Sequence, residues 1–106
     1  MFIYNVTVNV DDSIRLDWLQ WIKPHIKEVL ATGRFVSAKL TQVLADEGNG
    51  TTYAIQYTAE SRANLNAYYE LDAPKLREDG RKRFGDKSLA FRTELFVIDE
   101  FHAEDL

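Results

Sequence analysis

The chain begins with a regular alternation of side-chain character. Every second residue from Phe2 to Val10 is apolar, and the positions between them include Asn5, Thr7 and Asn9. A period of two with β-branched residues is typical of a strand that is buried on one face. We therefore expect a strand over this whole segment, with its more apolar side facing the core.

Helical spacing replaces this alternation after the first strand. Residues 11–13, Asp-Asp-Ser, offer side-chain oxygens that can cap a helix, and Gly33 is placed to end it. Pro24 interrupts the apolar stripe, so we expect one helix with a kink near Trp21 rather than two separate helices. The stripe consists of Ile14, Trp18, Trp21, Ile22, Ile26, Val29 and Leu30.

The middle of the chain predicts two strands joined by a tight connection. Residues 35–44 and 51–58 contain many of the β-branched and aromatic side chains that favour strands. Between them, residues 46–50 read Asp-Glu-Gly-Asn-Gly, a composition typical of a hairpin loop.

A second helix and a last strand complete the pattern. Ser61 can cap a helix that ends at Gly85, and Pro74 predicts a bend inside it where the helix restarts. Residues 88–101 are rich in Leu, Phe, Val and Ile and predict a long final strand.

The resulting order, β-α-β-β-α-β, predicts a fold class. Right-handed crossovers place both helices on one face of a four-stranded antiparallel sheet, which is the ferredoxin-like α+β arrangement. A length of 106 residues fits one domain. We therefore expect a single domain over residues 1–106, with an acidic tail at about residues 102–106.

Two helices cover only one face of such a sheet, so the other face meets water or a partner. When the more apolar set of each strand is assigned to the helices, the open face contains Asn5, Gln56, Arg92 and Glu94. Larger apolar side chains remain toward its edges, namely Phe35, Val43, Phe96 and Ile98. A monomer would leave those side chains exposed. We therefore predict a homodimer that pairs its open sheet faces around a partly polar interior, a dimeric α+β barrel.

Charge is modest overall and uneven along the chain. The formal net charge of −4 disfavours a nucleic-acid partner, because phosphate binding needs a basic surface. Residues 74–87 are locally +3, whereas the segment from Glu94 onward has five acidic side chains and no basic one. Solvated surfaces explain both segments; alternatively, the tail meets the basic stretch across a subunit contact.

Several absences narrow the chemistry. The chain has no cysteine, which excludes disulfides, cysteine-bound zinc and thiol nucleophiles. It has no apolar run long enough to span a membrane and no basic segment before its apolar start, so we expect no membrane partner, no secretory signal and a cytoplasmic location. Two distant histidines and no paired-carboxylate motif predict no metal site, and nucleotide-binding motifs are absent.

His25 is the strongest single candidate for chemistry. It lies beside Pro24 in the first helix and could titrate near neutral pH as a general base, or serve as a haem ligand. A packed histidine at the edge of the core is the alternative. Its helical phase places it next to Trp21, whose ring either packs in the core or stacks on a ligand.

The predicted open face supplies the other candidates. Arg92 and Glu94 lie two residues apart, so they form either an ion pair at the dimer contact or an anion-binding arginine with a carboxylate base. Asn5 and Gln56 come from the two central strands and could hydrogen-bond a polar ligand or a cluster of waters.

Several segments resemble a known family. They are IYNVT (Ile3–Thr7), HIKEVLATGRF (His25–Phe35), QYT (Gln56–Thr58), and FGDK with FRTEL (within Phe84–Leu95). In these segments the chain resembles domain of unknown function 4286, a family of small bacterial proteins. The resemblance implies a ferredoxin-like, dimeric α+β-barrel protein and no assigned activity.

The wider α+β-barrel group includes cofactor-independent monooxygenases, haem-degrading monooxygenases and lactone isomerases, which work in a cavity between helices and sheet. Haem-degrading members use a strand asparagine together with a histidine on the second helix. Asn5 matches that asparagine only loosely, and the second helix here has no histidine. We therefore expect no cofactor.

Three functions remain open. The first is a non-enzymatic homodimer, structural or regulatory, with or without a small bound ligand. The second is a cofactor-independent monooxygenase- or isomerase-like enzyme, in which Asn5, His25 and Arg92 converge on a small planar oxygenated substrate. The third is a nucleic-acid or protein docking module, disfavoured because the central open-face positions are Asn, Thr and Gln rather than base-stacking aromatics.

Overall fold

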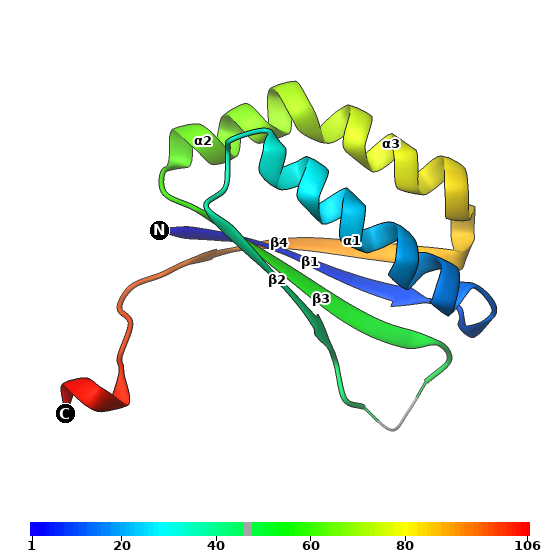
Figure 1. Cartoon of the computed structure of the whole chain (residues 1–106), viewed down its shortest axis with the longest axis horizontal. Coiled ribbons are helices and arrows are strands. Elements are labelled where there is room, and N and C mark those ends of the chain that lie inside the picture. Colours follow the sequence, from blue (N-terminus) through cyan, green and yellow to red (C-terminus); the bar gives the residue numbers. More distant parts are fainter. Residues whose placement is uncertain (46–47) are drawn as a thin grey trace.

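A computed structural model describes residues 1–45 and 48–106 of the chain. The main elements are β1 (Phe2–Val10), α1 (Arg15–Ala31), β2 (Ser37–Gln42), β3 (Thr51–Ala59), α2 (Arg62–Ala67), α3 (Ala73–Phe84) and β4 (Ser88–Phe96). The four strands form one antiparallel sheet in the order β2-β3-β1-β4. The helices lie on a single face of that sheet (Figure 1). The predicted ferredoxin-like α+β fold is confirmed.

The start of α1 follows the capping expected from the sequence. The Asp11 carboxylate accepts hydrogen bonds from the Ser13 backbone N–H at 2.9 Å and from its hydroxyl at 2.7 Å. A 3₁₀ turn over Asp12–Ile14 then leads into α1, which continues through Pro24 as one helix. The first half of the helical layer is therefore one continuous helix rather than two, as the sequence predicted.

The second helical segment restarts where proline predicted it. The Ser61 hydroxyl accepts a hydrogen bond from the Asn64 N–H at 3.1 Å and caps α2. A π-helical turn over Tyr68–Asp72 separates α2 from α3, and Pro74 lies at the beginning of α3. Such a turn keeps the chain helical while it accommodates a residue that cannot donate a backbone hydrogen bond.

The core lies between the sheet and the helices. Tyr4 is at its centre, with ring centroids 5.9 Å from Tyr57, 5.6 Å from Tyr68 and 6.2 Å from Phe35. The remaining buried side chains include Val6, Val8, Val10, Trp18, Ile22, Val29, Ile55, Leu65 and Leu76. The prediction that Phe35 faces outward is wrong. Phe35 precedes β2 in the connection from α1, so strand alternation does not fix its direction.

The face assignment of β4 is also corrected by the structure. Val6 is paired with Arg92 and Tyr4 with Glu94, and directly opposed residues share a face. Arg92, Glu94 and Phe96 therefore lie on the side of the helices, opposite to the prediction. The open face instead carries Leu89, Phe91, Thr93 and Leu95 from this strand.

The predicted strand lengths need adjustment at both edges of the sheet. β2 is shorter than the predicted 35–44, and β4 ends at Phe96 rather than at residue 101. After Val97, whose N–H donates to the Met1 carbonyl at 2.9 Å, the chain leaves the sheet and projects away from the helices (Figure 1). A 3₁₀ turn over Ala103–Asp105 lies near its end.

The hairpin between β2 and β3 was predicted at residues 46–50, of which 46–47 lie outside the described residues. Gly50 has a φ of +81°, a conformation that L side chains rarely adopt. A Cβ at Gly50 would lie 2.5 Å from the Val10 carbonyl oxygen. Glycine at this position therefore allows the end of the hairpin to approach β1.

Candidate functional site

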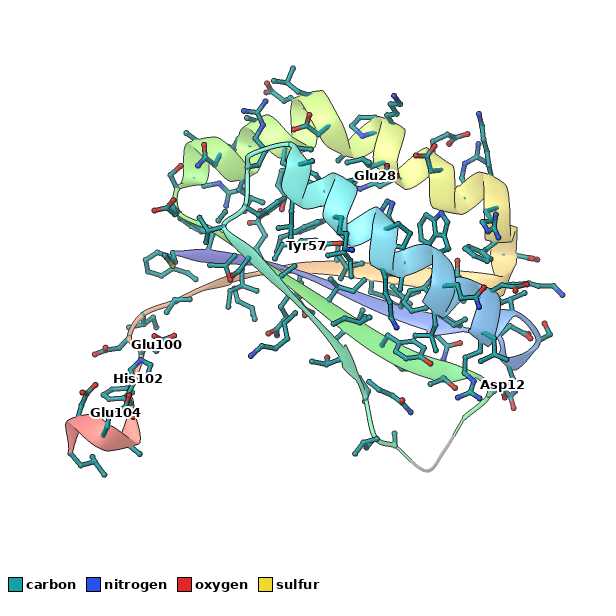
Figure 2. The ribbon with its side chains drawn as sticks, viewed as in Figure 1. Asp12, Glu28, Tyr57, Glu100, His102 and Glu104 are labelled. Atoms are coloured by element: carbon teal, nitrogen blue, oxygen red, sulfur yellow. The ribbon has the colours of Figure 1, made fainter. Side chains whose placement is uncertain are left out.

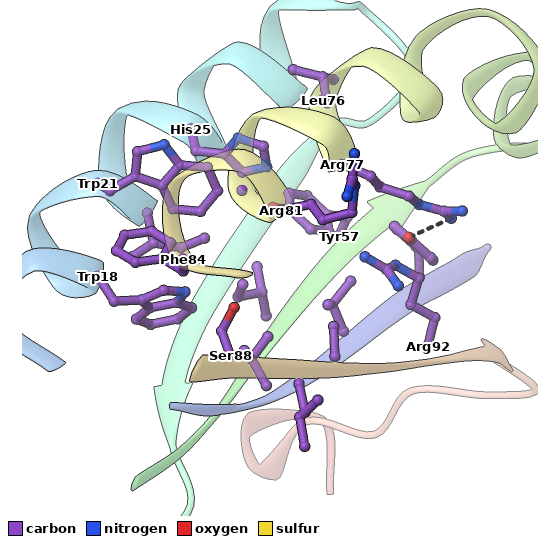
Figure 3. A pocket seen from close by; sticks show the side chains of 18 of the residues that line it. Trp18, Trp21, His25, Tyr57, Leu76, Arg77, Arg81, Phe84, Ser88 and Arg92 are labelled. Atoms are coloured by element: carbon purple, nitrogen blue, oxygen red, sulfur yellow. Dashed lines mark hydrogen bonds between the residues drawn. The ribbon is translucent and has the colours of Figure 1, made fainter. Parts of the chain in front are cut away.

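A pocket of about 330 Å³ lies under the helices, between α1, α3 and the β1–β4 side of the sheet (Figure 3). Its wall is mostly apolar and aromatic. The side chains that form this part of the wall include Trp18, Trp21, Ile22, Tyr57, Tyr68 and Phe84. A pocket of this size and character is typical of sites for small molecules.

Trp21 is held in place by contacts on both sides. Its ring stacks on His25 with a centroid distance of 4.4 Å and meets the edge of Phe84 at 5.4 Å. Gly80 of α3 faces the indole so closely that a Cβ there would lie 2.9 Å from Trp21 Cη2. The absence of a side chain at Gly80 thus makes room for the indole between α1 and α3.

His25 lies in the pocket wall, as the sequence placed it beside Trp21. Burial lowers the pKa of His25 below its usual 6.5, and Glu28 and Asp79 oppose this shift. The imidazole is therefore neutral at pH 7 and can accept a proton or a hydrogen bond.

Three arginines line the same pocket. Arg77 donates a hydrogen bond from Nη2 to the Tyr4 hydroxyl at 2.9 Å, and Arg81 donates from Nε to Glu78 at 2.8 Å. Within residues 1–45 and 48–106, Arg92 has neither an ion pair nor a side-chain hydrogen bond. None of the described residues that line the pocket is acidic.

The predicted pairing of Arg92 with Glu94 is wrong. The Glu94 carboxylate accepts hydrogen bonds from Arg62 at 2.9 and 2.7 Å and from the Tyr69 hydroxyl at 2.6 Å. These contacts lower the pKa of Glu94 from 4.5 to about 2, and the hydrogen bond with Arg62 makes the largest contribution. Glu94 joins the sheet to α2 and the π-helical turn, and its lone pairs are engaged there.

Asn5 and Gln56 lie on the open face, as expected, and face each other across β1 and β3. Asn5 donates hydrogen bonds to the hydroxyls of Thr7 at 3.2 Å and Thr93 at 3.3 Å. Because this face points away from the helices, Asn5 does not converge with His25 and Arg92. The three-residue catalytic group considered from the sequence is therefore wrong as formulated.

Sequence reasoning missed two of the arginines in this site. It interpreted residues 81–83 as a solvated basic face and gave Arg77 no role. The signal was available in the helical spacing, because Arg77, Gly80, Arg81 and Phe84 recur at intervals of three and four and therefore share one side of the helix.

The C-terminal segment has a histidine-carboxylate group of its own. Figure 2 shows Glu100, His102 and Glu104 together, apart from the helices, and His102 Nε2 lies 2.9 Å from Glu100 Oε2. Over residues 1–45 and 48–106, no cluster of three or more His, Asp or Glu side chains could hold a metal ion. In the same residues, every helix is too short or too polar to cross a membrane.

Comparison with solved structures supports the fold. A proposed antibiotic biosynthesis monooxygenase from Deinococcus radiodurans is 11% identical, with a TM-score of 0.69 over 96% of this chain and 97% of that one. A dimeric ferredoxin-like protein from an uncultured marine organism is 12% identical, with a TM-score of 0.65 over 94% and 97%. A designed protein with a ferredoxin fold is 19% identical, with a TM-score of 0.51 over 96% and 95%.

The family follows from the sequence itself. A search among curated proteins found no match. The family model described as domain of unknown function DUF4286 matches residues 1–98, nearly the whole chain. This protein therefore belongs to the DUF4286 family, an uncharacterised domain family with a ferredoxin-like fold.

Proposed function

We propose that the protein is a homodimer joined through its open sheet faces and that each subunit binds a small molecule in the pocket under its helices. The observation that carries the dimer is the apolar strip on β4. Leu89, Phe91 and Leu95 are 55%, 66% and 45% exposed in the single chain and lie on the same side of one edge strand. Such a strip is typical of a surface that a partner covers.

The rest of the open face is consistent with a partner of the same kind. Its centre carries Asn5, Thr7 and Gln56, which are short or uncharged polar groups that a second sheet can cover with hydrogen bonds and water. In a twofold dimer, the apolar strip on β4 of each copy would lie against the sheet of the other copy. The two β4 strands would face each other only where the axis passes. The resemblance in fold to a dimeric ferredoxin-like protein agrees with this arrangement.

The pocket supports the ligand half of the proposal. It is mostly apolar and carries a few polar groups, His25 and the arginines, that can orient a bound molecule. Among the described residues Arg92 has no ion pair or side-chain hydrogen bond, so an anionic group of a ligand can pair with its guanidinium.

Sedimentation velocity at micromolar concentration tests the dimer. We expect a particle of about 24 kDa, twice the chain mass of 12.2 kDa, and we expect Phe91→Glu to shift it to the monomer. Leu16→Glu is the matched control, because Leu16 is 70% exposed but lies on α1, away from the open face. A monomeric wild-type chain, or equal effects of the two substitutions, contradicts the dimer.

The alternative is catalysis in the same pocket, and the observation that favours it is the neutral imidazole of His25. A neutral imidazole in an apolar wall can act as a general base. Native mass spectrometry of the purified protein can identify a co-purified compound. Conversion of that compound by the wild-type chain but not by His25→Gln supports an enzyme, whereas unchanged compound in both supports a binding protein.

We also infer that the protein has no nucleic-acid partner and works in the cytoplasm. The central open-face side chains are not aromatic, and the net charge is −4. Salt-dependent binding to single-stranded RNA, measured by fluorescence anisotropy, would contradict the first inference. Fractionation of the native cells tests the second.

A further inference from the structure

We propose that the pocket binds a small planar aromatic carboxylate, with its ring beside the tryptophans and its carboxylate between Arg77 and Arg92. This inference rests on the proposed function, because it specifies the ligand class of the same pocket. Three observations support this ligand class. The pocket lining is positively charged, its charged and aromatic side chains lie at opposite ends, and the Arg92 donors are free among the described residues.

The lining is strongly positive within a chain that is acidic overall. Arg77, Arg81 and Arg92 all line the pocket, and none of the described lining residues is Asp or Glu. The whole chain has a net charge of −4, so this local excess is not a reflection of composition. A cluster of positive charge against low-dielectric walls favours an anion.

The charge is concentrated at one end of the pocket. Figure 3 shows Trp18, Trp21 and Phe84 at one end, with Arg77 and Arg92 at the other. The pKa of His25 is lowered by burial, so its imidazole adds no charge to the aromatic end at pH 7. A ligand that matches both ends has a flat apolar part and one anionic group.

Arg92 is the group best placed to receive the anion. The nearest acidic residue along its strand face, Glu94, is already bound by Arg62 and Tyr69 at 2.7 and 2.6 Å. The five N–H donors of the Arg92 guanidinium therefore remain available among the described residues. A planar guanidinium presents two parallel donors that match the two oxygens of a carboxylate.

Arg77 lies at the same end and completes the anion site. Its Nη2 donates to Tyr4, which leaves its other donors for a ligand. Arg77 and Arg92 also line a second, adjoining hollow, so the two guanidiniums stand at the junction of the two spaces. The acidic side chain in that hollow, Glu94, is already bound by Arg62 and Tyr69. Arg81 is paired with Glu78, so Arg77 and Arg92 are the two arginines of the described lining with donors available for a ligand.

The test uses three probes with the same ring: 2-naphthoate, 2-naphthalenemethanol and 2-naphthyl phosphate. Isothermal titration calorimetry gives the affinities, and ¹H–¹⁵N spectra locate the site. The chain has only two tryptophans, Trp18 and Trp21, and both line the pocket, so both indole N–H signals report binding there. We expect 2-naphthoate to shift these signals and to bind at least about tenfold tighter than the alcohol.

Substitutions separate the anion site from the pocket itself. Arg92→Gln and Arg77→Gln should each weaken 2-naphthoate about tenfold and change binding of the alcohol less than about twofold. Arg15→Gln is the control, because it removes the same charge from an exposed position at the start of α1. Thermal unfolding shows whether each variant is folded. The comparison of the three probes on the wild-type chain tests the proposal even if a variant does not fold.

The outcomes distinguish this inference from the proposed function. If the alcohol binds as tightly as 2-naphthoate, or if the Arg92 and Arg77 variants bind 2-naphthoate like wild type, the pocket stands and the carboxylate assignment fails. If 2-naphthyl phosphate binds more tightly than 2-naphthoate, the preferred anion is a phosphate and the carboxylate assignment also fails. If no probe moves the indole signals, ligand binding in the pocket fails, while the sedimentation test of the dimer stands by itself.

Discussion

At the scale of single residues, the Glu94 carboxylate accepts more side-chain hydrogen bonds than any other carboxylate within residues 1–45 and 48–106. Two nitrogens of Arg62 and the hydroxyl of Tyr69 converge on its two oxygens, which ties β4 to α2 and the π-helical turn. The side chain of Glu94 is 39% exposed, so water screens part of this interaction. The network is therefore worth much less than its pKa shift alone suggests.

We predict that Glu94→Gln lowers the free energy of unfolding at pH 7 by about 1 kcal/mol after allowance for screening. The pKa of Glu94 is about 2 in the folded protein against 4.5 ordinarily. A lowered carboxyl pKa stabilises the fold above the ordinary value, and this contribution is lost as pH falls from about 4.5 through about 2. Urea unfolding at pH 7 and pH 3 should therefore show a smaller difference between the two chains at pH 3.

Glu78→Gln is the matched control for this prediction. Glu78 accepts hydrogen bonds from a single arginine, Arg81, three residues along the same helix. Pairs of this kind on a helix surface contribute little. An equal effect of the two substitutions, or a Glu94→Gln effect that is the same at both pH values, argues against a special role for the Arg62–Glu94–Tyr69 network.

At the scale of elements, β4 shows where alternation alone misleads. Its apolar set is Leu89, Phe91 and Leu95, and the usual rule sends that set toward the helices. The alignment of β4 with β1 instead places this apolar set on the open face. Val10 is paired with Ser88, and the Asp11 N–H donates a hydrogen bond to the Lys87 carbonyl at 2.8 Å, which fixes the alignment. The rule assumes that the other face meets water. An inverted strand is what we expect where the second face is also covered.

The sequence could predict the elements but only part of the site. Strand and helix periods depend on neighbours within a few residues, so β1, α1 and the cap at Ser61 followed directly from the pattern. Trp21 and His25 could be placed together because they lie four residues apart on one side of the same helix. The face of the sheet on which Arg92 lies depends on how β4 is aligned with β1, and this alignment joins residues far apart in the sequence. Arg77 lines the pocket because α3 packs over that edge of the sheet, which the local pattern does not predict.

The contact between α1 and α3 yields a prediction at Gly80. Replacing a helical glycine by alanine ordinarily stabilises a protein by about 1 kcal/mol. At Gly80 the new methyl group would lie 2.9 Å from Trp21, whose ring is held by His25 and Phe84. Overpacking costs about 1–3 kcal/mol, so we predict that Gly80→Ala lowers the free energy of unfolding in urea and shifts the Trp21 indole signal.

A second background isolates the cause of that effect. In Trp21→Leu the indole is absent, so Gly80→Ala should recover the ordinary gain of about 1 kcal/mol in helix stability. The coupling between the two substitutions then measures the contact of the helices. Stabilisation by Gly80→Ala in the wild-type background shows instead that the indole moves freely and that Gly80 does not determine its position.

On the scale of the whole molecule, the C-terminal segment is separate from the domain. Residues 98–106 are exposed throughout, and Ile98 and Phe101 are 90% and 87% exposed. The segment carries four acidic side chains and projects away from α3, the basic helix of its own chain (Figure 1). Large apolar side chains on an acidic extension fit a contact with a second copy, whose residues 74–87 are basic.

We predict that a chain ending at Val97 forms a dimer that dissociates at least about tenfold more readily, because Ile98 and Phe101 lose apolar burial against the partner. Its thermal unfolding as a monomer should change little, since the removed residues are exposed in the single chain. Sedimentation equilibrium over a range of concentrations gives the dissociation constants of the two chains.

Two variants of the full chain separate the apolar contribution from the charge. Ile98→Asn with Phe101→Asn keeps the acidic groups, and Glu100→Gln with Glu104→Gln keeps the apolar ones. If charge complementarity to residues 74–87 holds the segment, the second variant weakens the dimer at about 0.05 M salt and much less at about 0.5 M, where exposed charges are screened. A truncated chain that dimerises like the full one shows that the open sheet face alone forms the interface, because the segment then contributes nothing to it.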